Sequence, residues 1–125
     1  MGPEDLGRFF IDRANAGDVD GLVALYERDA VLLAASGEVA SGPGSIRLVL
    51  EAMVSGMAAQ GTIFSGTPPP AVSRGDLALT YTRFTASHTS ADGRRATRKR
   101  ITAEVARRQP DGTRLLAIGQ PHILG

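Results

Sequence analysis

The sequence contains no cysteine and no tryptophan, and aromatic residues make up only 5% of it. The lack of cysteine excludes disulfides, thiolate metal sites and a cysteine nucleophile. No apolar run approaches the roughly 18 residues of a membrane-spanning helix, so we expect no membrane span. The N-terminus lacks a basic start followed by an apolar core, which argues against a secretory signal and makes the cytoplasm the expected location.

The 125 residues, 42% of them hydrophobic, are typical of one folded domain with one core. We therefore expect a single domain spanning residues 1–125, with a core large enough to enclose a small pocket. Thirteen arginines stand against one lysine, and alanine and glycine are abundant. This bias points to a bacterial source.

The net charge of +1 conceals an asymmetry along the chain. Residues 1–62 carry four basic and nine acidic groups, whereas residues 63–125 carry ten basic and four acidic groups. The densest basic cluster is Arg94, Arg95, Arg98, Lys99 and Arg100. No aromatic residue follows Phe84, so we do not expect nucleic-acid binding. The cluster favours a solvated strand face, or a surface for a partner's acidic helices.

Three helices are predicted in the N-terminal half from apolar residues at helical spacing. The first begins after Pro3-Glu4-Asp5, and the second is capped by Asp18 and ended by Asp29. The third runs from about residue 43 to 59. Their apolar faces consist of Leu6, Phe9, Phe10 and Ala14; of Leu22, Leu25 and Tyr26; and of Ile46, Val49, Leu50, Met53 and Met57.

Strand patterns occupy most of the remaining chain. A short strand over 30–35 turns at Ser36-Gly37 and returns over 38–40, and another strand over 62–65 stops at the prolines 68–70. Three long strands follow, over 76–88, 96–108 and 113–123, joined by turns at Asp92-Gly93 and at Pro110-Asp111-Gly112. They predict an antiparallel meander that curls around the helices, with its concave face lining a cavity.

This order of elements resembles the cone-shaped α+β fold of the NTF2-like superfamily, in particular its SnoaL-like and ketosteroid isomerase-like branch. The residues that carry the resemblance are Gly17-Asp18-Val19-Asp20, Leu25-Tyr26, Asp29-Ala30-Val31, Gly42 with Ile46-Arg47, and Arg107-Arg108-Gln109-Pro110-Asp111-Gly112. The resemblance covers nearly the whole chain. It implies three N-terminal helices packed on a curved antiparallel sheet, and a homodimer supported by the Arg-rich convex face of that sheet.

Ketosteroid isomerase relatives use a general-base aspartate and an oxyanion hole made of a tyrosine and a protonated carboxylic acid. Matching Asp29-Ala30-Val31 to the family's segment puts Ala34 where the base would stand, so steroid-type isomerisation is not expected. The Arg107–Gly112 turn puts Glu104 at or near the position of the protonated acid. A one-residue slip would turn Glu104 to the other face, and an Arg100–Glu104 ion pair is the alternative to a functional role.

His122 is the second candidate catalytic residue, because an imidazole can relay protons near neutral pH. A packing or exposed role is the alternative. The candidates for lining a pocket are Tyr26, Ala34, Met53, Tyr81 and Thr102. Tyr81 and His88 occupy odd and even positions of one strand, so only one of them can face the cavity. Two histidines thirty-four residues apart, with no carboxylate at ligand spacing, predict no metal site, and no cofactor is expected.

Two functions remain open from the sequence. The first is binding of a small hydrophobic ligand in an enclosed pocket, with polyketide cyclases and isomerases as the enzymes that the resemblance implies. The second is a non-catalytic homodimeric association domain with a vestigial cavity. A ligand binder predicts an enclosed space of a few hundred cubic ångströms reached by an ionisable side chain. An association domain predicts that Phe10, Met57 and Phe64 fill that space.

Overall fold

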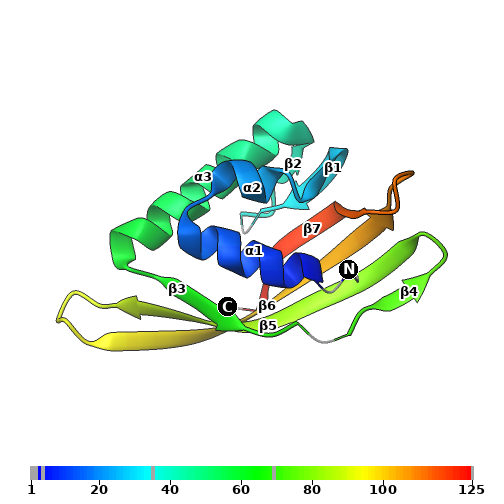
Figure 1. Ribbon diagram of the computed structural model, residues 1–125. Helices are drawn as coiled ribbons and strands as arrows, with labels where there is room; N and C mark the ends of the chain where they lie inside the picture. The colour runs from blue at the N-terminus through cyan, green and yellow to red at the C-terminus, as the bar shows by residue number, and fades with distance from the viewer. Residues whose placement is uncertain (1–2, 4, 35, 69, 125) are drawn as a thin grey trace.

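The structure is a computed structural model that describes residues 3, 5–34, 36–68 and 70–124, with side chains described as far as Gly119. Within these residues, three helices lie on one face of a seven-stranded sheet (Figure 1). The helices are α1 (Asp5–Ala16), α2 (Val19–Val23) and α3 (Gly42–Gln60). The strands are β1 (Tyr26–Leu33), β2 (Val39–Ser41), β3 (Ile63–Gly66), β4 (Val72–Arg74), β5 (Leu77–Thr89), β6 (Arg95–Arg108) and β7 (Arg114–Leu124). We call the face of the sheet that the helices cover concave, and the opposite face convex.

The strand order is β2-β1-β7-β6-β5-β3, with β4 paired to the beginning of β5. The three long strands β5, β6 and β7 form the predicted antiparallel meander. Strand β1 pairs in parallel with β7, so the first strand of the chain lies beside the last. This single parallel pairing makes the sheet mixed.

Helix α3 runs close to its predicted bounds. Pro43 stands in its first turn, where a missing N–H is tolerated, and Gly61 ends it with a φ of 62°. Its inner face buries Ile46, Leu50 and Met57, as the helical spacing predicts. None of the described helices, α3 included, is long and apolar enough to cross a membrane.

The prediction that Tyr26 lies on the second helix is wrong. Helix α2 ends at Val23, and Tyr26 is the first residue of β1, which begins four residues earlier than the predicted strand. The carbonyl of Leu25 already accepts a hydrogen bond from the N–H of Leu116 at 2.7 Å. Pairing with a strand some ninety residues later therefore overrides the local helical spacing.

The pairing of β5 with β6 decides which side chains face the helices. Thr80 lies opposite Glu104, and Thr82 lies opposite Thr102. From Ala78 to Ala86 the even-numbered residues of β5 are buried, whereas the odd-numbered ones are mostly exposed. The even-numbered residues of this ladder therefore lie on the concave face, beneath the helices.

Strand β4 is absent from the sequence prediction. Prolines 68–70 were expected to end a strand at the sheet edge, but the chain resumes pairing at Val72, which lies opposite Leu79. The turn between β4 and β5 contains Gly75 with a φ of 59°, a conformation that favours glycine. A tight glycine turn thus adds a short edge strand that the local sequence pattern does not reveal.

Asn15 ties the end of α1 to the edge strand β3. Its side-chain amide donates to the carbonyl of Phe64 at 2.8 Å and accepts from the N–H of Phe64 at 2.7 Å. Both groups of Phe64 face outward, because β3 is the last strand of the sheet order. One side chain thereby satisfies two backbone groups and fixes α1 across the concave face.

We expect Asn15→Ala to lower the free energy of unfolding by about 1–2 kcal/mol, because two backbone groups lose their partner. Asn15→Asp keeps the acceptor and loses the donor, so its cost should lie between those of the wild type and the alanine variant. Urea denaturation measures all three. The control is Asp12→Ala, an exposed position on the same helix. If Asn15→Ala costs no more than this control, the tie between α1 and β3 does not stabilise the fold.

Candidate functional site

A cluster of polar side chains lies on the concave face of β5 and β6. Thr80, Thr82 and Thr102 are all buried, although threonine is mostly found at protein surfaces. Glu104 belongs to the same face, because it pairs with Thr80 across the ladder. Four polar residues therefore lie together where a sheet packed under helices is normally apolar.

Glu104 is the ionisable group of this cluster. The hydroxyl of Thr80 donates a hydrogen bond to Glu104 Oε2 at 3.1 Å, and the side chain of Thr102 also bonds to the carboxyl group. Burial raises the pKa of Glu104 above its ordinary value, and the bonds to Thr102 and Thr80 oppose that rise without cancelling it. Glu104 therefore keeps its proton to a higher pH than a surface glutamate does.

Tyr26 approaches the cluster from β1. Gly119 lies opposite Glu104 on β7, and a side chain at Gly119 would meet the Tyr26 ring at 3.1 Å and its hydroxyl oxygen at 3.4 Å. Burial, followed by the negative charge of Glu104, raises the pKa of Tyr26. The phenol thus stays protonated, and the absence of a side chain at Gly119 makes room for it beside Glu104.

The hydroxyl of Thr82 is buried and has no hydrogen-bond partner among the residues that the structure describes. Helix α1 passes directly over it, since a Cβ at Gly7 would come within 2.5 Å of Thr82 Oγ1. A buried hydroxyl without a partner is energetically unfavourable by roughly 1–3 kcal/mol. This hydroxyl is therefore a donor and acceptor that remains available on the concave face.

The other predicted site residues occupy different places. Thr102 is buried beside Glu104. Met53, on α3, lines a separate pocket with His88 near the β5–β6 hairpin. Ala34 follows the end of β1 and sits in the turn to β2, where its N–H bonds to the carbonyl of Glu38 at 2.9 Å. The side chain of His122 lies outside the described residues, so its catalytic role stays a prediction.

The prediction that Tyr81 lines a pocket is wrong. Tyr81 lies opposite Ala103 at an odd-numbered position of β5 and is 40% exposed on the convex face. The guanidinium of Arg83 stands 6.0 Å from the centre of its ring. His88, by contrast, lines a pocket on the concave side. The expectation that only one of these two residues can face the interior is therefore confirmed.

The alternative role for Glu104, an ion pair with Arg100, stays a prediction. Met57 and Phe64, which were expected to fill the space in an association domain, are both buried. Phe10 is only partly buried against the core. The interior beneath the helices thus combines apolar filling with one carboxyl group held by hydroxyls.

No group of three or more potential metal ligands occurs among the side chains that the structure describes. The groups that Glu104 and Tyr26 offer on the concave face are proton donors, because burial raises the pKa of each. A carboxylic acid and a phenol can donate hydrogen bonds to an oxygen that becomes negative during a reaction. Such a pair can polarise a carbonyl group without a metal ion or an organic cofactor.

Thr80, Thr82 and Gly119 escaped the sequence prediction. The signal for the two threonines was present, because they occupy every second position together with Ala78 and Phe84, so that a strand puts all four on one face. Only the cross-strand pairing shows that they share a face with Glu104. For Gly119 no local signal existed, since its role depends on Tyr26, which lies 93 positions earlier.

A family model described as a SnoaL-like domain matches residues 7–112. No curated protein matches the chain. The matched segment includes all three helices except the first residues of α1, together with Glu104 and the turn after β6. The match thus extends over most of the chain and includes the polar cluster.

Solved structures with the same fold are similar to this chain at low sequence identity. An NTF2-like protein with a cystatin-like fold from Novosphingobium aromaticivorans has a TM-score of 0.80 at 18% identity, covering 94% of this chain and 76% of that one. A ketosteroid isomerase-like protein from Erwinia carotovora atroseptica has a TM-score of 0.75 at 16% identity, covering 98% and 94%. A protein named as a calcium/calmodulin-dependent protein kinase type II association domain, from Thiobacillus denitrificans, has a TM-score of 0.76 at 17% identity, covering 96% and 94%. These likenesses confirm the predicted α+β fold.

The raised pKa of Glu104 predicts how stability depends on pH. A carboxyl group that binds its proton more tightly when folded contributes stability that is fully present below its unfolded pKa of about 4.5 and is lost as the pH rises through the folded pKa. We expect the wild type to lose stability relative to Glu104→Gln as the pH rises above about 4.5, because glutamine carries no charge to desolvate. Urea denaturation at a series of pH values from 4.5 to 8 measures the difference.

Glu38→Gln is the matched control, because Glu38 is exposed in the turn between β1 and β2. Its stability difference from the wild type should stay nearly constant over the same pH range. If the difference in free energy of unfolding between the wild type and Glu104→Gln is also constant over this pH range, the Glu104 carboxyl is not desolvated.

Proposed function

This chain belongs to the SnoaL-like family of the NTF2-like superfamily, and on that premise we propose that it binds a small hydrophobic molecule against the concave face of its sheet. Glu104, in its protonated form, donates a hydrogen bond to an oxygen of that molecule. The observation that carries the proposal is the interior carboxyl group of Glu104, which is held by the hydroxyl groups of Thr80 and Thr102. The domain acts in the cytoplasm.

Two proton donors support this function. Burial raises the pKa values of both Glu104 and Tyr26, so both groups favour the protonated form in which they can donate. Directed at a carbonyl oxygen, such donors stabilise the negative charge that develops there when the neighbouring bonds rearrange. The reaction class that fits is an isomerisation or cyclisation without a cofactor.

The missing base limits the chemistry. The resemblance puts Ala34 at the position of the general base, and an alanine side chain cannot accept a proton. The chain therefore supports binding and polarisation of a carbonyl compound better than it supports proton abstraction. Any proton transfer would use Glu104 itself or a group carried by the ligand.

A pair of probes with the same shape tests the hydrogen bond from Glu104. 1-Acetonaphthone carries a carbonyl oxygen, whereas 1-ethylnaphthalene replaces it with hydrogen. We expect the wild type to bind the ketone about tenfold more tightly, because a buried donor that meets no acceptor is left unsatisfied. Titrations followed by protein NMR give both dissociation constants.

Two variants separate the donor from the charge. Glu104→Met has a similar shape without a donor, so the preference for the ketone should disappear. Glu104→Gln keeps an N–H donor and should retain most of the preference. If the wild type and Glu104→Met discriminate equally between the two probes, or if neither probe binds the folded wild type, Glu104 is not the ligand-binding donor.

The convex face supports a second candidate function, homodimerisation. A row of apolar side chains crosses four strands, since Val72 pairs with Leu79, Leu79 with Val105, and Val105 with Ile118. Leu79 is 55% exposed and Ile118 is 48% exposed. Tyr81 extends the row along β5. A contiguous apolar patch of this kind on a surface is typical of an interaction site.

A second copy of this chain is the occupant that we propose for this face. Two copies stacked face to face around a twofold axis bury the same row from both sides, which is the commonest symmetry of homo-oligomers. The similar structure from Thiobacillus denitrificans is named as an association domain, which favours the same use of this fold. Ligand binding and dimerisation use opposite faces and are compatible.

We expect the double variant Leu79→Glu and Ile118→Glu to convert a wild-type dimer to a monomer, because two carboxylates per copy would be buried unpaired. Sedimentation velocity at several concentrations measures the mass. The control is Leu48→Glu, an equally apolar residue that is 69% exposed on α3. A wild type that is monomeric at high concentration, or a double variant that still dimerises, would exclude this interface.

A further inference from the structure

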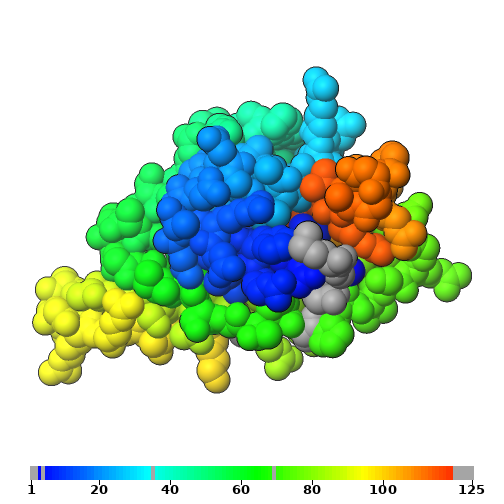
Figure 2. Space-filling model, in the orientation of Figure 1, coloured from blue at the N-terminus to red at the C-terminus, as the bar shows by residue number. Residues whose placement is uncertain are grey.

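A pocket lies on the concave side, between the C-terminal half of α3 and the outer part of the β5–β6 hairpin. Its volume is about 360 Å³. Figure 1 shows α3 ending above β3, and Figure 2 shows the hairpin projecting beyond the helices at this end of the molecule. The pocket therefore opens at the rim of the sheet, away from the turn between β6 and β7.

The pocket has a basic wall. Arg98 and Arg100 are two residues apart on β6, so both point to the face that carries Glu104, and both line the pocket together with His88. None of the described residues in its lining is acidic. Burial, followed by the like charge of Arg98, lowers the pKa of Arg100.

The opposite wall is apolar. Met53 and Met57 of α3 and Phe64 of β3 line it, and Phe64 contacts Phe84 with ring centroids 4.8 Å apart. Methionine side chains are flexible and polarizable, so they adapt to ligands of different shape. A pocket with two arginines on one side and two methionines on the other matches a molecule that is charged at one end and apolar at the other.

We propose that this pocket binds an amphipathic organic anion, with its carboxylate on Arg98 and Arg100 and its apolar part against Met53, Met57 and Phe64. A guanidinium group forms paired hydrogen bonds with a carboxylate, which makes arginine the preferred partner of this group. The expectation that the arginines of the basic cluster lie on the convex face is wrong for Arg98 and Arg100, because both line this pocket on the concave side. Arg98 and Arg100 serve the pocket, whereas Lys99 between them points to the convex side.

The ligand of the proposed function would then have a charged end as well. This inference rests on the proposed function only in taking the concave face as a ligand site. Arg100 and Glu104 are four positions apart on β6, a distance of roughly 13 Å in an extended strand. The anion can bind at the arginines whether or not Glu104 contacts the ligand. The two sites can therefore fail separately in an experiment.

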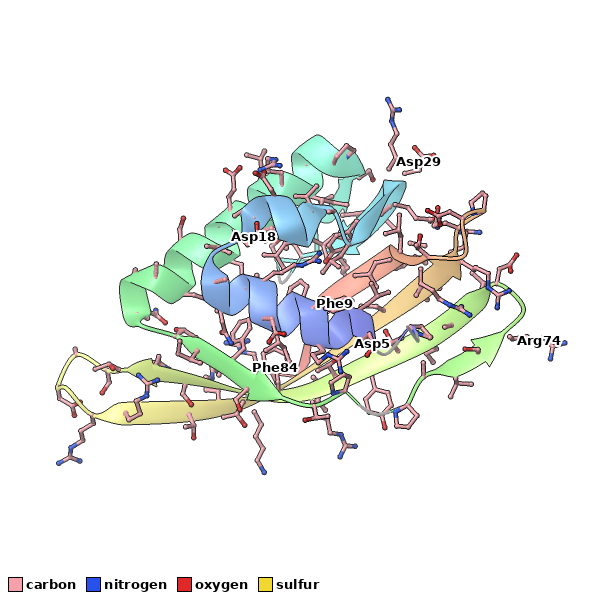
Figure 3. All side chains as sticks on the ribbon, in the orientation of Figure 1. Asp5, Phe9, Asp18, Asp29, Arg74 and Phe84 are labelled. Atoms are coloured by element: carbon pink, nitrogen blue, oxygen red, sulfur yellow. The ribbon has the colours of Figure 1, made fainter. Side chains whose placement is uncertain are left out.

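Octanoate is the test probe, compared with 1-octanol and octylammonium by isothermal titration calorimetry. We expect octanoate alone to bind measurably, and its affinity to fall by about tenfold or more in the double variant Arg98→Gln and Arg100→Gln, because charge-assisted hydrogen bonds are lost. The matched control is Arg74→Gln with Lys99→Gln, which removes the same charge. Figure 3 shows Arg74 extending away from the molecule, so the control should change the affinity by less than about twofold.

Further affinity measurements test whether the apolar wall contributes to binding and whether octanoate binding depends on Glu104. Affinity should rise from acetate through hexanoate to octanoate, since each added methylene is removed from water. Glu104→Gln should bind octanoate as the wild type does, even if the ketone preference of the proposed function fails. Equal octanoate affinity in the two double variants, acetate binding as tight as octanoate binding, or no binding of octanoate to the folded wild type would each overturn the inference.

Discussion

The pairing of β5 with β6 is the constraint on which the rest of the structure depends. The loop between them spans residues 90–94, and the bond from the N–H of Ser90 to the carbonyl of Arg94 leaves a turn of three residues, 91–93, in which Gly93 takes a φ of 83°. This loop aligns Thr80 with Glu104. A two-residue turn would shift the ladder by one position and bring Tyr81 opposite Glu104 instead. Since side chains alternate between faces, one position decides whether Glu104 lies among hydroxyl groups or beside a tyrosine ring.

The polar interior and the close approach of α1 depend on each other. Helix α1 can cross the sheet above Thr82 because Gly7 has no side chain there. Its last turn is held by the bonds between Asn15 and Phe64. The helix thereby covers buried hydroxyls that an apolar core would not contain. Groups that are unfavourable for stability and are nevertheless kept in a core are typical of functional sites.

The sheet separates two kinds of surface. Its concave face combines the carboxyl group of Glu104 with the arginines of the hairpin pocket, and its convex face carries an apolar row that includes Leu79 and Ile118. Both faces are built from the same strands, because alternate residues of β5 and β6 point in opposite directions. The proposed ligand and the proposed second copy of the chain would therefore occupy opposite faces of the same strands.

The sequence by itself determined the elements whose signals are local. The apolar spacing around Ile46 and Leu50 predicted α3, and the glycine turns at Gly93 and Gly112 predicted the antiparallel meander. The same local patterns, matched to a known family, predicted the α+β cone and drew attention to Glu104. These signals suffice because helix periodicity and turn geometry depend on residues only a few positions apart.

Only the tertiary structure decided the features that depend on distant residues. Pairing with β7 turned Tyr26 from a helical residue into a strand residue beside Gly119. The exact length of one loop assigned Tyr81 to the convex face and Thr80 to the concave face. A short stretch of sequence cannot predict either outcome. The energies that select them, those of strand pairing and of burial beneath the helices, arise between segments that meet only in the folded chain.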